Sequence, residues 1–400
     1  MNQTPQEPGR KFLGFGRNIA VMLAMVVLLG LGEELWSRFI PKYLELLGAS
    51  AWVIAFYGTL RDFLDAVYQY PGGWIADRVG PRRALALFAV IAAVGYSVVA
   101  MSWHWSGILI GTIFVMAWGS LTTPAIFAII GDSLPKTRRA TGFGVQSIVK
   151  RIPVVLGPIL GGALVGAYGF SQGIRAGLIA TIAFAVIAIV IVLKLYAEKI
   201  SIPFERAKFR VHWNEMDRSL KRLLVADCFA RWAEGIPDVF IVLYALNVLR
   251  VSPLEFGWLT GIQMVTSILV YIPIAKLSDR FNRKPFVLLT FAFFALFPLA
   301  LATATSFPFI VLAFIVGGLR EIGEPARKAL IVDLAKETAR GRAIGMYYLI
   351  RGLVVFPASI LGGWFWTMNK QLPMYSAFAI GVVGFGFYAL FGPSEKSALT

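Results

Sequence analysis

The sequence predicts an all-α integral membrane protein with twelve transmembrane helices, arranged as two pseudo-symmetric six-helix bundles. Three observations lead to this prediction: apolar stretches of membrane-spanning length recur along the chain, basic residues gather in alternate loops, and the chain repeats itself. The composition agrees with it, because 58% of the 400 residues are hydrophobic and only 15% are charged. A soluble domain carries about 25% charged residues, so this composition argues against a soluble globular protein.

The apolar stretches are each about 20 residues long, which is the length that a helix needs to cross the hydrocarbon core of a bilayer. Bulk lipid cannot satisfy a bare backbone, so these stretches are expected to be helices. A transmembrane barrel would instead give segments of about 10 alternating residues. We expect helices near residues 19–43, 51–72, 84–103, 107–131, 141–168, 173–196, 222–246, 254–276, 286–304, 307–333, 342–366 and 373–392.

The basic residues indicate the orientation of the chain. Twelve crossings place both termini on one side, and that side holds 25 of the Lys and Arg residues against 4 on the other. The positive-inside rule then puts both termini in the cytoplasm. The net charge of +16 is therefore interpreted as a topology signal, and we expect a lipid bilayer and no nucleic acid as partner. We expect a multi-pass protein of a cell membrane, and the short loops favour the inner membrane of a bacterium.

An internal repeat relates the two halves of the chain. Pro71 and Arg78 match Pro273 and Arg280 at an offset of 202 residues. Further along the offset is 201, as in the pairs Gly144 and Gly345, Lys150 and Arg351, and Gly161-Gly162 and Gly362-Gly363. Two such halves are one layout of secondary transporters. The predicted domains are 1–196 and 222–400, joined by a cytoplasmic linker over 197–221.

The segment between the second and third expected helices carries a resemblance to a known family. It reads Gly73-Trp74-Ile75-Ala76-Asp77-Arg78-Val79-Gly80-Pro81-Arg82-Arg83 and resembles the signature loop of the major facilitator superfamily. Glycines permit a tight turn, and a carboxylate can face a helix N-terminus. The resemblance implies the fold of that superfamily and a latch on the cytoplasmic gate. The expected gating residues are Gly73, Asp77, Arg78, Gly80, Arg82, Arg83, Asp132 and Arg139, with Asp279 and Arg280 in the second half.

The fifth expected helix is similar to the antiporter motif of drug/proton exchangers. The residues that carry this similarity are Gly157, Pro158, Gly161 and Gly162, with Pro153 where the motif has glycine. The alternative is generic close packing between helices, since small residues let helix backbones approach. The arginine that such exchangers carry in helix 4 is absent from residues 113–120, which speaks against their standard mode of proton coupling.

Charged residues inside the expected helices are candidates for substrate binding or coupling, because a charge in lipid is costly. A structural alternative stays open: Glu34 and Arg38, Arg61 and Asp65, and Arg320 and Glu324 are spaced to pair on one helix face. The candidates are Glu33, Glu34, Arg38, Arg61, Asp62, Asp65, Lys150, Arg151, Arg231, Glu234, Asp238, Arg320, Glu321, Glu324 and Arg351.

Three of these cations lack an acid within their own helix. They are Lys150, Arg151 and Arg351, and they must face another helix, a water-filled cavity or an anionic substrate. Since Lys150 and Arg351 are equivalent in the repeat, together they would suit a carboxylate or phosphate group. Arginine binds such a group through a planar fork and lysine as a point charge.

These features predict a secondary active transporter that moves a small organic solute by alternating access. The leading hypothesis is proton-coupled efflux by antiport, with Glu33, Glu34, Asp62 and Glu234 as acids that exchange the proton. The alternative is an organic-anion transporter working as exchanger or proton symporter. A sensor built on the same fold is a third class. No Walker loop, HExxH sequence or nucleophile elbow occurs, so we expect no enzyme, cofactor or metal, and a monomer.

Overall fold

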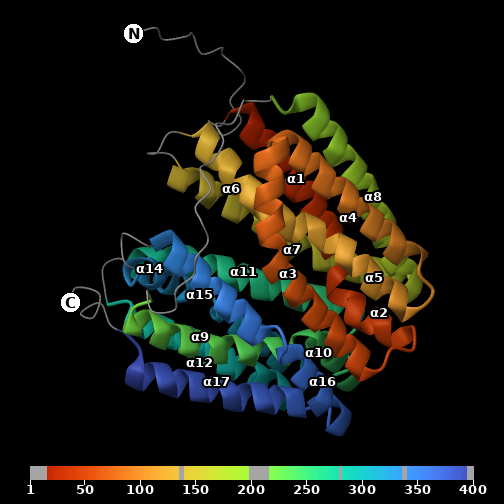
Figure 1. Cartoon of the computed structure of the whole chain (residues 1–400). Helices are drawn as coiled ribbons and strands as arrows, with labels where there is room; N and C mark the ends of the chain where they lie inside the picture. The colour runs from red at the N-terminus through yellow and green to blue at the C-terminus, as the bar shows by residue number, and fades with distance from the viewer. Residues whose placement is uncertain (1–15, 135–138, 198–215, 279–281, 336–339, 394–400) are drawn as a thin grey trace, which may run out of the picture. The chain divides into compact units, whose positions relative to one another are not determined.

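The computed structural model describes residues 16–134, 139–197, 216–278, 282–335 and 340–393 (Figure 1). Every regular element within these stretches is a helix. The elements of the first half are α1 (Arg17–Glu34), η1 (Ser37–Phe39), α2 (Ile40–Leu46), α3 (Ala51–Val79), α4 (Pro81–Met101), α5 (Trp105–Met116), η2 (Ala117–Leu121), α6 (Thr122–Ser133), α7 (Arg139–Tyr168) and α8 (Phe170–Leu195). Those of the second half are α9 (Arg218–Gly235), α10 (Asp238–Leu243), η5 (Tyr244–Val248), α11 (Pro253–Ser278), α12 (Lys284–Thr303), α13 (Phe307–Leu319), α14 (Glu324–Asp333), α15 (Arg340–Val355), α16 (Ala358–Met368) and α17 (Leu372–Phe391).

Seven helical segments among the described residues are long and apolar enough to cross a membrane. They are Arg17–Leu46, Pro81–Met101, Val145–Tyr168, Phe170–Leu195, Lys284–Thr303, Ala343–Met368 and Leu372–Phe391, and Trp105–Leu121 is a shorter apolar helix. Each coincides with a range predicted from the apolar stretches. The chain is therefore an all-helical, multi-pass membrane protein.

Several of the helices are interrupted where the sequence carries charge. α1 ends at Glu34, and α9 ends at Gly235, 201 residues later. Pro237 follows α9 and lacks the backbone N–H that would continue the helix. α13 ends at Leu319, and α14 begins only at Glu324. Transporters form their binding sites from such discontinuous helices, so these breaks mark the regions where a site is expected.

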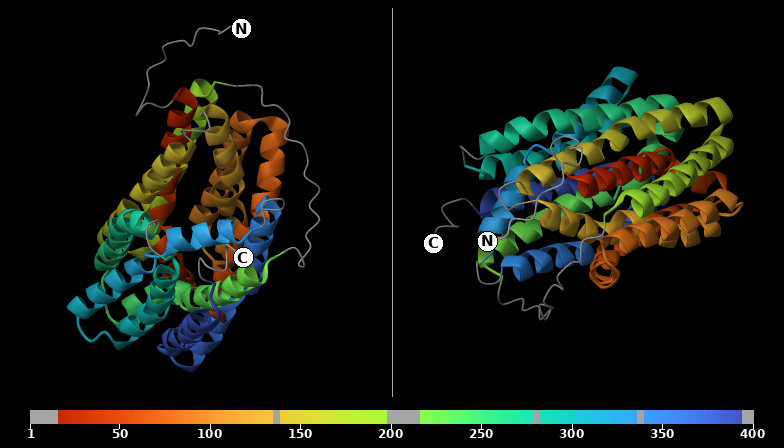
Figure 2. Two further views of the ribbon diagram at one scale, coloured as in Figure 1. Left: turned by 90° about the vertical axis from the view of Figure 1, so that its left-hand side faces the viewer. Right: turned by 90° about the horizontal axis from the view of Figure 1, so that it is seen from above.

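The described residues form two compact units by contact. Among these residues, the first holds 16–35, 67–134, 139–157 and 175–197, and the second holds 36–66, 158–174, 216–278, 282–335 and 340–393. The second unit thus includes two segments of the first sequence half. Its apolar core lies between α9, α12, α14, α15 and α17, and α17 packs along both α9 and α12 (Figures 1 and 2).

The glycines of the repeat make matching close approaches. A Cβ on Gly162 would collide with the backbone of Pro253, and one on Gly363 would lie 3.2 Å from the carbonyl oxygen of Ala51. Pro253 and Ala51 are themselves related by the offset of 202 residues. In the first unit, Gly157 lies against the backbone and Cβ of Glu34. Gly157 and Gly162 of the fifth-helix motif therefore take part in close helix contacts, as small residues do between membrane helices.

Candidate functional site

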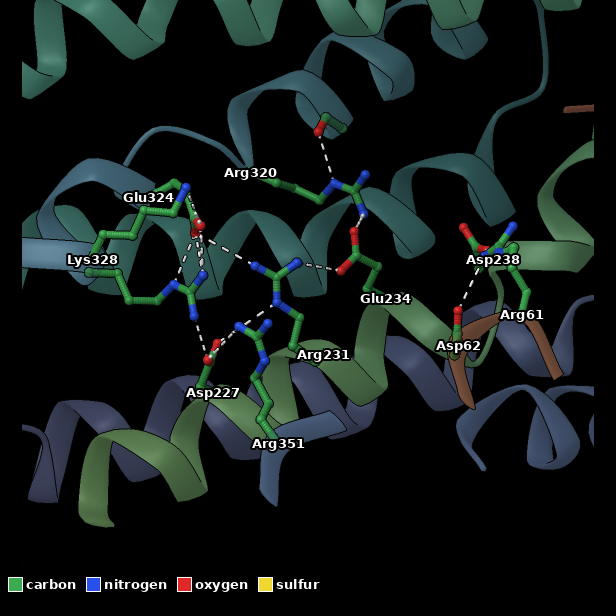
Figure 3. A network of polar contacts seen from close by, with 12 residues as sticks. Arg61, Asp62, Asp227, Arg231, Glu234, Asp238, Arg320, Glu324, Lys328 and Arg351 are labelled. Carbon is green, nitrogen blue, oxygen red and sulfur yellow. Dashed lines mark hydrogen bonds and ion pairs between the residues drawn. The ribbon is translucent and has the colours of Figure 1, made fainter. Parts of the chain in front are cut away.

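A network of charged side chains lies inside the second unit (Figure 3). α9 contributes Asp227, Arg231 and Glu234, which are spaced by four and three residues and so lie on one face of the helix. The interrupted pair α13 and α14 contributes Arg320 at the break and several charges after it, and α15 contributes Arg351. Arg351 follows Asp227 by 124 positions in the chain, so it is the packing of the helices that brings these residues together.

One part of the network, called here the buried cluster, consists of Asp227, Glu324, Arg327 and Tyr347. Arg327 and Asp227 are each only 1% exposed, and they form an ion pair. The Nε of Arg327 donates to Glu324 at 2.9 Å, and the hydroxyl of Tyr347 donates to Asp227 at 2.9 Å. Glu324 stands in the first turn of α14, where the helix dipole favours a negative charge. Each charge is thus matched, and the cluster ties α9, α14 and α15 together.

A second part, called here the open group, consists of Arg231, Glu234 and Arg320. The guanidinium of Arg231 donates to Glu234 at 2.7 Å, and a nitrogen of Arg320 lies 3.4 Å from the other carboxylate oxygen. Arg320 also donates to the carbonyl oxygen of Gly317 at 2.9 Å. The ring of Phe294 lies beside both guanidinium groups, at 5.2 and 5.3 Å. Glu234 is 31% exposed, so this carboxylate is paired and only partly enclosed by the protein.

A third part joins α3 to α10. Arg61 pairs with Asp238, in the first turn of α10, and lies 3.5 Å from Asp62 (Figure 3). All three side chains are about one third exposed. The carboxylate of Asp62 also experiences the charge of Glu234. The third part and the open group are therefore electrostatically linked.

The first unit holds a smaller set of charges. The hydroxyl of Tyr96, which is fully buried, donates to Glu33 at 2.6 Å. Lys150 is exposed and lies within electrostatic reach of Glu33. Glu34, the last residue of α1, packs against Gly157. Glu33 and Glu234 each lie near the end of an interrupted helix, α1 and α9 respectively.

One predicted pair differs in the structure. The spacing of Arg320 and Glu324 left open that they pair on one helix face, but the helix is interrupted between them. Among the described residues Arg320 therefore pairs with Glu234, and Glu324 pairs with Arg327, Lys328 and Arg231. Of the remaining candidates, Arg38 and Asp65 are exposed, Arg151 is partly buried on α7, and Glu321 lies in the break after α13.

The predicted gating residues are described only in part. Gly80 has a φ of +85°, which favours glycine and permits the sharp turn from α3 to α4. Arg78 stacks on Trp74 at 5.3 Å, and Arg82 donates to the carbonyl oxygen of Leu193. Gly73 is partly buried, and Arg83 is exposed. Asp279 and Arg280 lie outside the described residues, as do the side chains of Asp77, Asp132 and Arg139.

The site contains residues that the sequence did not single out. Asp227 was not among the candidates, and it accepts hydrogen bonds from three side chains. Its position four residues before Arg231 is the signal that would have found it. Tyr96 and Tyr347 carry no such signal, because each meets its carboxylate from a distant helix.

Membrane-spanning helices, helix breaks and a partly exposed charge network in the same segments define a membrane transporter. The family model described as "Major Facilitator Superfamily" matches residues 12–221 and 223–399. The chain therefore belongs to the Major Facilitator Superfamily, and it is a transporter rather than an enzyme.

Similar proteins agree with this assignment. The chain is 25% identical over 374 residues to an uncharacterized MFS-type transporter of Methanocaldococcus jannaschii, covering 90% of this chain and 91% of the relative. It is 26% identical over 358 residues to the multidrug resistance protein MdtH of Salmonella arizonae, covering 86% and 85%. A solved POT family transporter in complex with 5-aminolevulinic acid is similar in fold, with a TM-score of 0.76, 14% identity, and coverage of 96% of this chain and 97% of that one.

Proposed function

We propose that the chain is a proton-coupled antiporter that exports a small organic solute by alternating access. The observation that carries this proposal is the position of Glu234. Its carboxylate lies at the end of α9, next to a helix break, and is shared by Arg231 and Arg320 while remaining 31% exposed. A carboxylate with access to solvent can exchange a proton, whereas a fully enclosed ion pair cannot do so without opening.

Protonation of Glu234 would change the partners of both arginines. Neutral Glu234 would hold Arg320 less strongly, while Arg231 would keep Glu324 at 3.5 Å and Asp227 at 3.9 Å. A solute that binds at the open group therefore competes with the proton for the same side chains. Such competition couples the two fluxes in opposite directions, because each alternation carries either a proton or a solute.

Export is supported by the relatives. Several relatives are named multidrug resistance protein MdtH. They are 24–26% identical to this chain, and the match covers 85–87% of their length. At this identity the names support the direction of transport and leave the solute open. The motif of the fifth expected helix, which lies in α7, resembles that of drug/proton exchangers and also favours export.

The proposal includes twelve membrane crossings in two six-helix bundles, 1–196 and 222–400, with both termini in the cytoplasm of a bacterial cell and a monomeric protein. Matching glycine approaches at Gly162 and Gly363, and matching helix ends at Glu34 and Gly235, support the two related halves. The linker 197–221 would then connect the halves on the cytoplasmic side.

The test is solute-driven proton movement in proteoliposomes that enclose a pH-sensitive dye. Tetraphenylphosphonium and phenyl phosphate serve as a cationic and an anionic probe. We expect a probe gradient to drive protons in the opposite direction, and Glu234→Gln to abolish this flux. Glu255→Gln is the matched control, because Glu255 is an exposed carboxylate in the first turn of α11. Unchanged proton flux in Glu234→Gln would refute coupling through this residue.

A second candidate function is organic-anion transport, by exchange or by symport with protons. The charges of the network favour it, because positive side chains outnumber negative ones in the described ion pairs. In the ion pairs described for the buried cluster and the open group, the cations are Arg231, Arg320, Arg327, Lys328 and Arg351, and the acids are Asp227, Glu234 and Glu324. In symport, phenyl phosphate would drive protons in its own direction, so the sign of the flux separates the two functions.

A further inference from the structure

The cations of the second unit differ in how fully their donors are used. Arg327 is 1% exposed and directs its guanidinium nitrogens to Asp227 and Glu324. Arg351, in contrast, is 22% exposed and, among the described residues, donates a single hydrogen bond, from Nη1 to Asp227 at 3.2 Å. A guanidinium carries five N–H donors. Arg351 therefore has donors to spare on a side chain that solvent reaches.

Arg351 is also the cation that can change partner at the lowest cost. Asp227 keeps Arg327 and the hydroxyl of Tyr347 when Arg351 moves away, so the buried carboxylate is not left bare. The guanidinium of Arg351 stacks on the ring of Tyr348 at 4.7 Å. Stacking holds the plane of the guanidinium and leaves its edge, which carries the N–H groups, available for a planar anion.

A buried donor of Arg231 lies close to the carboxylate that Arg351 contacts. The Nε of Arg231 is buried and has no hydrogen-bond acceptor among the described residues. It lies 3.9 Å from the second oxygen of Asp227, the carboxylate that Arg351 also contacts (Figure 3). Together with the excess of cations in this network, an unsatisfied arginine donor indicates a place for a negatively charged ligand.

We propose that Arg351 anchors a carboxylate or phosphate group on the transported solute, with Arg231 completing the contact. This inference rests on the proposed transport function and specifies the chemistry of its substrate. Arg351 does not itself contact Glu234, because its described contacts are with Asp227 and Tyr348. Arg231 joins the anchor to the proton site, since it donates to Glu234 at 2.7 Å. A solute held at Arg351 and Arg231 can thus compete with the proton at Glu234 for Arg231.

The experiment is isothermal titration of the purified full chain in an uncharged detergent, without any gradient. The probes are benzoate and phenyl phosphate, with benzyl alcohol as the uncharged counterpart and phosphatidylglycerol as the lipid source of a phosphate group. We expect both small anions to bind and benzyl alcohol to bind more weakly. Arg351→Gln should weaken anion binding about tenfold or more, the size of a hydrogen bond to a charged group.

Two further variants make the result specific. Arg351→Lys should keep part of the affinity, because lysine retains the charge but not the planar fork. Lys328→Gln is the matched control: it removes one positive charge from the same network, but from a side chain that is 54% exposed and pairs with Glu324. We expect it to change affinity by about twofold or less. Thermal melting of each variant verifies that it is folded.

Three results would overturn the anchor. They are unchanged anion affinity in Arg351→Gln, equal affinity for benzyl alcohol, and binding of phosphatidylglycerol without binding of the small anions. Because binding is measured without a gradient, it is independent of proton coupling. Anion binding that depends on Arg351, in a protein that moves no protons, would refute the antiport function and keep the anchor.

Discussion

The buried cluster and the open group lie in the same unit and use the same kinds of side chain, yet their surroundings differ. In the buried cluster Arg327 and Asp227 are almost completely enclosed, and each has more than one partner. In the open group Glu234 has two arginine partners and remains accessible to solvent. The first arrangement suits a fixed connection between helices, and the second suits a group that changes its charge during transport. We therefore expect exposure, rather than residue type or the number of partners, to separate structural from functional charges.

The largest expected effect is on the buried cluster. Arg327→Met removes the shared cation and leaves Asp227 and Glu324 buried without their main partner. Breaking a buried ion pair in this way costs about 3–5 kcal/mol. We expect a strong loss of folded protein and of melting temperature, measured in detergent by circular dichroism. A variant that melts like the parent protein would show that the buried cluster is not structural.

A smaller loss of stability is expected when the buried cluster loses a neutral hydrogen-bond donor. Tyr347→Phe removes the hydroxyl that donates to Asp227 at 2.9 Å and keeps the aromatic ring. A hydrogen bond to a charged group contributes about 1.5–3 kcal/mol. The melting temperature should fall by less than in Arg327→Met. Tyr348→Phe is the control, since its ring stacks on Arg351 and no hydrogen bond of its hydroxyl is described; equal losses in both variants would contradict the assignment.

The smallest effect on stability is expected in the open group. Arg320→Gln removes an ion pair of 3.4 Å between side chains that are partly exposed. Such a pair contributes about 0–1 kcal/mol, so melting should change little while solute-driven proton flux declines. A loss of stability as large as that in Arg327→Met would place Arg320 among the structural charges.

Much of the fold follows from sequence patterns. Apolar stretches predicted the helices, and the offset of about 201 residues predicted equivalent positions that make equivalent glycine contacts. The break after α9 also has a local signal, because Gly235 and Pro237 both disfavour a continuous helix. The length of a hydrophobic stretch, however, does not show where a helix is interrupted. This is why the spacing of Arg320 and Glu324 left open a pair that the structure does not form.

The partners within the site could be predicted only in part. Charges four residues apart on one helix suggest local pairs, but Arg327 meets Asp227 across 100 positions, and Arg61 meets Asp238 across 177. Such pairs depend on how the helices pack against one another, and no local pattern in a single sequence specifies this packing. The sequence therefore identified most of the charged residues of the site and did not divide them between the buried cluster and the open group.

The most direct test compares Glu234→Gln with Asp227→Asn, two substitutions that each neutralise one acid of α9. Melting temperature and solute-driven proton flux are measured for both variants. We predict that Glu234→Gln melts like the parent protein and has lost the flux, whereas Asp227→Asn is strongly destabilised. Parental flux in Glu234→Gln, or parental stability in Asp227→Asn, would contradict the separation of functional from structural charges.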